Sequence, residues 1–199
     1  MTAQQAVIGY VLVVLIGGIV GTAVARLAVL RAGIGALITG MQTMPSVLWY
    51  PLAYMVFGQR SSGIVLMMVL GAAPSVANGF ISGIDQVPPG LLRAGVLGAR
   101  RISLERHVVP PAALPSVLGG LKQGSAFAWH ALMAGEFLIL VNPLSLGGRT
   151  VNALTQGDCA TVVAMMIVIV FIGIMVEMAF SRVDAAVRSR YGSVDATTG

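Results

Sequence analysis

Apolar residues run in long stretches along this chain, separated by short polar links. Residues 1–25, 32–59 and 61–84 each contain no Asp, Glu, Lys or Arg. Because a helix needs about 20 apolar residues to cross the hydrocarbon core of a bilayer, these stretches predict membrane-spanning helices. Five spans are predicted, at residues 6–25, 34–57, 63–83, 115–141 and 161–180. We therefore expect an all-α integral membrane protein.

Glycines and prolines add two features to the predicted spans. Three pairs of glycines stand four residues apart, at positions 17 and 21, 79 and 83, and 120 and 124. In lipid, helices associate by close backbone approach at such small residues, so we expect ordinary packing between spans rather than a dedicated dimer face. Pro45 and Pro51 interrupt the second predicted span, because proline lacks the N–H that a helix interior needs.

Composition agrees with a membrane protein and excludes other classes. Of the 199 residues, 57% are hydrophobic and 10% are charged, whereas soluble domains carry about 25% charged residues. These values exclude a disordered chain, a disulfide-stabilised secreted fold and a soluble α/β enzyme. The single Cys159 and the two histidines, His107 and His130, cannot by themselves form a zinc site. The sequence contains no Walker A motif, and we predict no catalytic residue and no metal site.

The basic residues gather on one side of the predicted membrane. Five spans place the termini on opposite sides, and only Arg60 and Arg149 of the twelve Lys and Arg residues then face the N-terminal side. Because cytoplasmic loops are enriched in Lys and Arg, we expect the loop 85–109 and the C-terminus in the cytoplasm. The net charge of +5 is then mainly an orientation signal, and we expect no nucleic-acid partner. Whether a further helix precedes the first span is left open.

The loop between the third and fourth spans carries its own helix signals. Pro88 and Pro89 favour the start of a helix, and Gly98 favours a left-handed stop. Ser103 can cap a second short helix. A connection between helices needs only about 2–8 residues, so we interpret this segment as a docking element on the cytoplasmic face. The alternative is a plain connection that supplies the basic charge for orientation.

The spacing within this loop resembles the cytoplasmic signature of binding-protein-dependent ABC importer permeases, EAA-x3-G-x9-I-x-LP. Ala94 matches the second alanine, Gly98 the glycine, Val108 the isoleucine and Pro111 the proline.

The same loop departs from the signature at three positions. Leu92 stands in place of the glutamate, Arg93 in place of the first alanine and Pro110 in place of the leucine. In the family, this segment docks on the ATPase subunit. The resemblance therefore implies ATPase contacts from Leu92, Arg93, Ala94, Gly98, Arg100, Arg101 and Arg106.

Motifs outside the loop extend the resemblance over nearly the whole chain. Residues 45–52 (PSVLWYPL), Ala128-Trp129 with Glu136, and residues 146–148 (LGG) are similar to segments of nitrate/sulfonate/taurine-type permeases. The resemblance implies a type I ABC importer permease with a transmembrane permease domain at 1–182, its coupling loop at 85–109, and a cytoplasmic tail at 183–199. The family usually has six spans, and its usual first helix has no counterpart among the five predicted here.

The resemblance also implies a function. It indicates alternating-access transport of a small anionic or zwitterionic solute across the bacterial inner membrane. The implied partners are ABC ATPase subunits, a second permease copy in a homodimer, an extracytoplasmic solute-binding protein and membrane lipid. ATP and Mg would bind to the ATPase, leaving no cofactor in this chain. From the residues alone, an ATP-independent channel or secondary transporter and a membrane scaffold subunit stay open as alternatives.

The fourth predicted span contains an unusual polar strip. Lys122, Trp129 and Glu136 recur every seven residues and share one helical face, while Gln123 and His130 form a parallel stripe. Ionisable groups inside a membrane are costly and usually face a pathway or a partner. We expect Lys122 to reach the cytoplasmic interface.

We expect the translocation path to be lined by Trp49, Tyr50, Gln123, Trp129, His130 and Glu136. Trp49 and Tyr50 are included because they lie between the two prolines that break the second span. The alternative is that His130 and Glu136 are satisfied by neighbouring helices and that the aromatic residues fill a gap between helices. In the last span, we expect Glu177 to pair with Arg182.

Overall fold

The computed structural model of this protein describes residues 2–85, 109–139 and 141–191. These residues form the helices α1 (Thr2–Arg26), α2 (Ala28–Thr43), the 3-10 helix η1 (Ser46–Trp49), α3 (Tyr50–Phe57), α4 (Ser61–Asp85), α7 (Val109–Leu138), α8 (Leu146–Thr155) and α9 (Cys159–Tyr191). Every regular element in these ranges is a helix, which confirms the all-α prediction. The residues predicted to dock the ATPase lie at 92–106, outside the described part of the chain.

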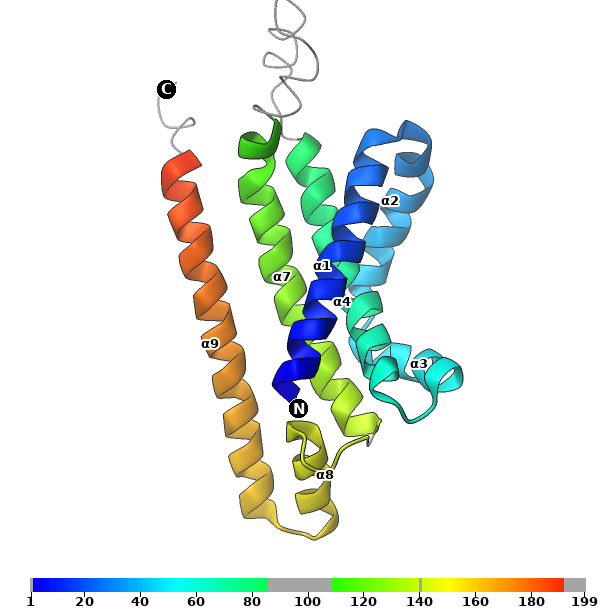
Figure 1. The fold of residues 1–199 in the computed structure, drawn as a ribbon, viewed down its shortest axis with the longest axis vertical. Helices are drawn as coiled ribbons and strands as arrows, with labels where there is room; N and C mark the ends of the chain where they lie inside the picture. Colours follow the sequence, from blue (N-terminus) through cyan, green and yellow to red (C-terminus); the bar gives the residue numbers. More distant parts are fainter. Residues whose placement is uncertain (1, 86–108, 140, 192–199) are drawn as a thin grey trace, which may run out of the picture.

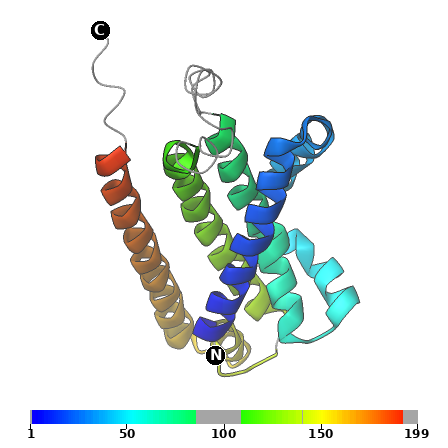
Figure 2. The ribbon, with the colours of Figure 1, turned by 45° about the horizontal axis from the view of Figure 1, so that its top comes forward.

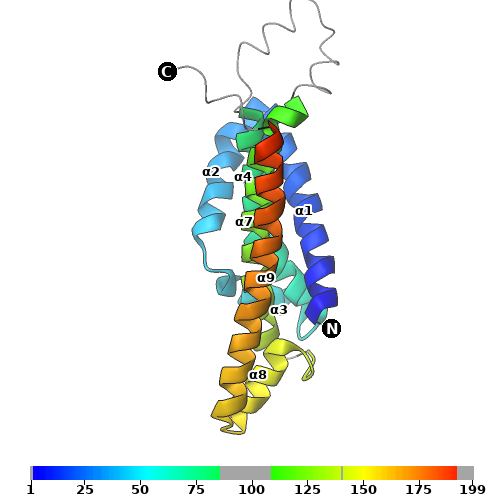
Figure 3. The ribbon, with the colours of Figure 1, turned by 90° about the vertical axis from the view of Figure 1, so that its left-hand side faces the viewer.

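The long helices run alongside one another, and the chain crosses the molecule from end to end (Figure 1). The start of α1 lies near α8 at one end, whereas the end of α4, the start of α7 and the end of α9 lie at the other (Figures 1 and 3). The two ends of the described chain therefore lie at opposite ends of the bundle. An odd number of crossings requires this arrangement.

Three helices of the described chain are long and apolar enough to cross a membrane. They are α1, α4 and the part of α9 from Cys159 to Val187. The helix α7 has 30 residues and runs beside them, but its polar strip makes it less apolar. The last helix extends beyond the predicted span to Tyr191, so the first part of the predicted tail at 183–199 is helical.

The second predicted span is broken where the sequence indicates. The helix α2 ends at Thr43, and Met44 is extended with φ −78° and ψ 128°, as expected for a residue before proline. Pro45 then precedes η1. Pro51, in contrast, lies in the first turn of α3, where its missing N–H costs nothing. The second span is thus two helical pieces joined at Pro45 and Met44.

The turn into α9 is set by two residues. Gly157 has φ +71°, a conformation that glycine adopts without strain. Asp158 then caps α9 by accepting hydrogen bonds from the Thr161 hydroxyl at 2.5 Å and the Thr161 backbone N–H at 3.1 Å. These hydrogen bonds favour the charged carboxylate and lower the pKa of Asp158.

The buried centre of the bundle is α4, which packs between α1 and α7. Its side chains Met67, Met68, Ala72 and Val76 are at most 1% exposed. In contrast, the apolar window of α9 contains no buried residue, and this helix stands on the outer side of α7 (Figure 2). The core therefore consists of α1, α4 and α7.

Glycines bring these three helices into backbone contact. A Cβ atom built on Gly120 would lie 2.6 Å from the Cα of Gly79, closer than real Cβ contacts come. Gly21 of α1 lies equally close to α4, since a Cβ atom built on it would lie 2.5 Å from the Ala77 carbonyl oxygen. Both residues of each predicted glycine pair face α4 or α7 in this way. This confirms that the pairs serve packing between helices of one chain.

Replacing Gly120 by Ala is expected to lower the midpoint of thermal unfolding of the detergent-solubilised protein by about 5 °C, because the added methyl group forces α4 and α7 apart. Gly119→Ala is the matched control, since a Cβ at Gly119 meets no described atom within 4 Å. The control should leave the midpoint unchanged or raise it slightly, because alanine favours helix over glycine. Equal midpoints for the two variants would contradict the close packing.

Candidate functional site

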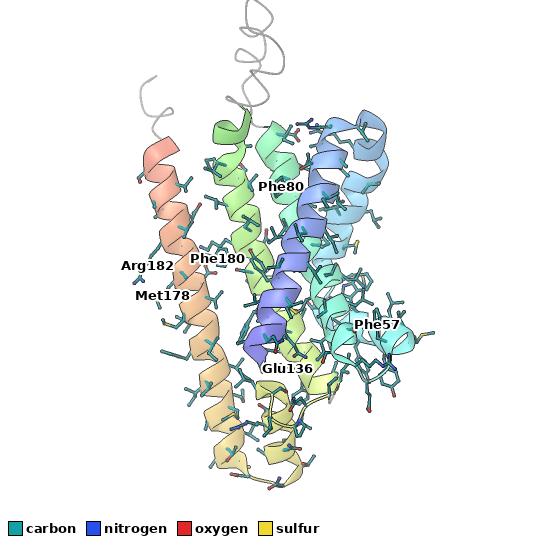
Figure 4. The ribbon with its side chains drawn as sticks, viewed as in Figure 1. Phe57, Phe80, Glu136, Met178, Phe180 and Arg182 are labelled. Atoms are coloured by element: carbon teal, nitrogen blue, oxygen red, sulfur yellow. The ribbon has the colours of Figure 1, made fainter. Side chains whose placement is uncertain are left out.

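The polar strip of α7 divides between two neighbours. Near the middle of the helix, the Lys122 Nζ lies 2.9 Å from the Glu177 Oε1 of α9. Lys122 is therefore paired with α9, and its position at the cytoplasmic interface stays a prediction. Glu177 contacts α7 instead of Arg182, its expected partner, which lies on the side of α9 away from α7 (Figure 4).

Two turns along α7, Trp129 packs against α9 beside a glycine. A Cβ atom at Gly173 would lie 3.2 Å from the Trp129 Nε1, so the absence of a side chain there admits the indole ring. A cavity of about 440 Å³ opens between α7 and α9 at this level, and its lining includes Ser125, Trp129, His130 and Glu177. The cavity lies beside the Lys122–Glu177 ion pair.

A second cavity, of about 410 Å³, lies on the other side of His130. We call it the break cavity, because it lies where α2 ends and η1 begins. Its lining consists of Gln42, Thr43, Met44, Pro45, Ser46, Val47, Gly71, Phe127, His130 and Ala134. His130 is exposed at the surface of the chain and is the one histidine among the described residues. It therefore separates a cavity shared with α9 from one shared with α2.

The other predicted path residues lie outside these two cavities. Gln123 is exposed on α7, and Trp49 and Tyr50 are half-buried against the core. The Tyr50 ring lies 5.7 Å from the ring of Tyr54, and the Trp49 Nε1 is buried with no hydrogen-bond partner among the described residues. The structure thus brings together Trp129 and His130 but not all six predicted residues. Their role in transport stays a prediction.

Glu136 is buried at the N-terminal end of the bundle, beside α1 and α8 (Figure 4). Its Oε2 accepts hydrogen bonds from the Gly147 backbone N–H at 3.0 Å and the Thr2 hydroxyl at 3.2 Å. The Thr2 oxygen in turn accepts from the Leu146 N–H at 3.1 Å. A carboxylate is favoured at the N-terminus of a helix, where free N–H groups and the helix dipole meet. Glu136 therefore ties α1 and α7 to the start of α8.

The glycines at 147 and 148 make this contact possible. A Cβ at Gly147 would lie 2.6 Å from the Glu136 Cβ, and one at Gly148 would lie 2.2 Å from the Asn142 carbonyl oxygen. Ser145 completes the cap by accepting from the Gly148 N–H at 3.0 Å. The two glycines of the LGG motif are thus needed because a side chain at either position would clash with the end of α7 or with the loop that follows it.

A larger groove contains none of the predicted path residues. It has a volume of about 790 Å³, lies between α1 and α4, and is lined mainly by apolar side chains such as Ile8, Leu12 and Leu66. At the opposite end from α8, Arg31 of α2 forms an ion pair with Asp85, the last residue of α4. This ion pair fixes α2 to α4 next to the point where the coupling loop begins.

Sequence reasoning missed the contributions of α2 to this site. Gln42 and Thr43 line the break cavity, yet they stand out neither by charge nor by a motif. The available signal was Pro45, because a broken helix at membrane depth leaves backbone groups that need a cavity or a protein cover. Polar residues flanking such a proline are therefore candidates in their own right.

The chain belongs to a known family of membrane transport proteins. Residues 6–190 match the family described as the binding-protein-dependent transport system inner membrane component. This confirms the resemblance seen in the sequence. The family and the apolar helices together make the protein a multi-pass inner-membrane transport subunit.

Three curated relatives are between 26% and 32% identical to the chain over the aligned residues. It is 32% identical to a putative ABC transporter permease of Methanocaldococcus jannaschii, over 71% of this chain and 53% of that protein. It is 29% identical to a nitrate import permease of Synechococcus elongatus, over 69% of this chain and 50% of that one. It is 26% identical to a taurine transport permease of Escherichia coli, over 91% of this chain and 66% of that one. The chain thus spans about half to two thirds of these relatives.

A solved structure establishes the fold. An inward-facing structure of the MetNI methionine ABC transporter contains a chain that superposes with a TM-score of 0.73. The match covers 94% of this chain and 92% of that one, at 19% sequence identity. The fold is therefore that of a type I ABC importer permease, as the resemblance predicted.

Replacing Glu136 by Leu is expected to lower the midpoint of thermal unfolding by about 5 °C, because the Gly147 N–H and the Thr2 hydroxyl lose their acceptor. Hydrogen exchange at the start of α8 should accelerate as well. Glu136→Gln is the control, since its amide oxygen still accepts from Gly147 and the loss should be smaller. If Leu and Gln behave alike, the hydrogen bonds do not hold α8.

Proposed function

We propose that this chain is the transmembrane subunit of an ATP-driven importer and forms the path for a small anionic or zwitterionic solute. Family membership supports the transport role, and two relatives are a nitrate import permease and a taurine transport permease. The observation that carries the proposal is the position of His130, a polar side chain of a spanning helix that lines two cavities.

The proposed mechanism uses the unequal packing of the helices. ATP and Mg bind to a separate ATPase, which docks on the coupling loop at 85–109 on the cytoplasmic side. The loop joins α4 to α7, so a push on it acts directly on the core pair. The outer helices α2 and α9 contact that pair across the two cavities, and their movement would open the path to one side at a time.

We assign the remaining partners to the two ends of the helix bundle and to the outer face of α9. We place the C-terminus in the cytoplasm, because basic residues concentrate at that end. A solute-binding protein would then dock at the α8 end. A second permease copy would form a homodimer and, with membrane lipid, cover exposed apolar side chains of α9 such as Ile167 and Phe171.

The alternatives are an ATP-independent channel or secondary transporter and a membrane scaffold subunit. A channel or secondary transporter would move solute without ATP, and a scaffold would show no solute flux. Neither needs a docking element between α4 and α7. Uptake measured in proteoliposomes with and without ATP separates the three possibilities.

We expect uptake of nitrate or taurine by the reconstituted importer to require ATP, the ATPase and the binding protein. Replacing Gly98 and Arg106 by Ala should weaken copurification of the ATPase by about tenfold or more, because the docking surface loses its turn and a charge. Arg149→Ala is the control, since this exposed Arg lies on α8 at the other end of the bundle. Wild-type ATPase binding by the double variant would contradict docking through this loop.

A further inference from the structure

We propose that the break cavity binds the oxyanion of the solute, with the Gln42 amide and the His130 imidazole as the donors. The inference rests on the proposed function and adds to it a location and a recognition chemistry. It differs from the expectation drawn from the sequence, which named no residue of α2 and placed the path along α7 with Trp49 and Tyr50.

The cavity lies inside the span, away from both ends of the bundle. Gly71, on its α4 wall, lies about 15 Å along α4 from Ser61, in a helix about 37 Å long. His130, on its α7 wall, lies about 12 Å from the end of that helix at Leu138. A solute held here would be well within the membrane, next to the break between α2 and η1, where the regular helical hydrogen bonding is interrupted.

The walls offer donors that lack acceptors. The Gln42 Nε2 is buried and has no hydrogen-bond partner among the described residues. A buried polar group left unpaired is costly, so such a group points to a ligand or water that satisfies it. Thr43 is different, since its hydroxyl already donates to the Gly40 carbonyl oxygen at 2.7 Å. Gln42 and His130 are therefore the residues of the described cavity wall with side-chain N–H donors, and Ser46 adds a hydroxyl.

The two cavities that His130 lines differ in the charge of their lining residues. No Asp or Glu is among the described residues that line the break cavity. The cavity toward α9 contains Glu177, whose charge is already balanced by Lys122. An anion in the α9 cavity would face a carboxylate, whereas in the break cavity it would meet amide, hydroxyl and imidazole groups. The electrostatic balance thus favours the break cavity for an anion.

The size of the cavity fits a small solute. Its volume is about 410 Å³, against about 30 Å³ for one molecule of liquid water. A planar oxyanion such as nitrate fits with part of its hydration shell, and a sulfonate with a short carbon chain fits as well. Apolar walls from Val47, Phe127 and Ala134 would contact the non-charged part of such a solute.

The first test asks whether an anion occupies the cavity, independently of transport. In a Cys159→Ser background, Ser46→Cys places a thiol in the wall of the break cavity. Nitrate at millimolar concentration is expected to slow labelling of this thiol by about fivefold relative to gluconate, because a bound anion blocks the reagent. Adding Gln42→Glu should abolish the protection, since its carboxylate repels nitrate. Equal labelling rates in nitrate and gluconate would overturn the proposed site.

The second test uses the complete importer. Gln42→Glu is expected to lower the nitrate transported per ATP hydrolysed by about tenfold, while Gln42→Leu lowers it less because it adds no repelling charge. Gln59→Glu, which adds a carboxylate to the exposed link between α3 and α4, should match the wild type. A variant that merely fails to fold would lose ATPase activity together with uptake, so the ratio isolates the site.

The two tests distinguish failure of the site from failure of the proposed function. Protection by nitrate without ATP-driven uptake by the wild type would support the cavity and overturn the importer role. Wild-type uptake with an unchanged ratio for Gln42→Glu would support the importer and overturn the cavity as the solute site.

Discussion

The backbone contact between α4 and α7 at Gly79 and Gly120 constrains the rest of this structure. Because no side chain separates the two helices there, any residue larger than glycine at either position would clash with the facing backbone. Association of helices in lipid depends on such close packing, since apolar side chains gain little by leaving lipid tails. The contact sets which face of α7 is buried against α4 and which is left for polar groups. Lys122, Trp129 and His130 occupy the faces that remain.

Around this core, the contacts weaken outward. At one end, Glu136 ties α7 to α1 and α8 through a single carboxylate oxygen. On the flanks, the polar contacts of α2 and α9 with the core include the Arg31–Asp85 and Lys122–Glu177 ion pairs. Cavities open on both sides of His130, between the core and these outer helices. The proposed alternating-access mechanism uses this difference in packing between the core and its flanks.

The sequence predicted the elements better than the contacts between them. The lengths of the apolar runs located the spans, and Pro45 marked the break in the second one. Both signals depend only on residues that are close together in the sequence. The pairing of Lys122 with Glu177 was missed, since their positions in the sequence carry no record of which helices are neighbours. Gln42 was missed for a related reason: an uncharged amide becomes notable only when its donor is seen buried and unpaired. The sequence marks Glu136 as unusual, but only the fold shows that its carboxylate accepts a hydrogen bond from the Gly147 N–H at the start of α8.

If the polar face of α7 lines a water-filled path, water-soluble reagents reach it, and cysteine accessibility tests this directly. In a Cys159→Ser background, single cysteines at Gln123 and His130 are expected to react with a charged, membrane-impermeant thiol reagent. Cysteines at the buried Leu132 and at the exposed but apolar Ile167 of α9 should not react, because protein and lipid exclude the reagent. If the thiols at 123 and 130 are as unreactive as the thiol at 167, this face of α7 meets lipid or protein and lines no path.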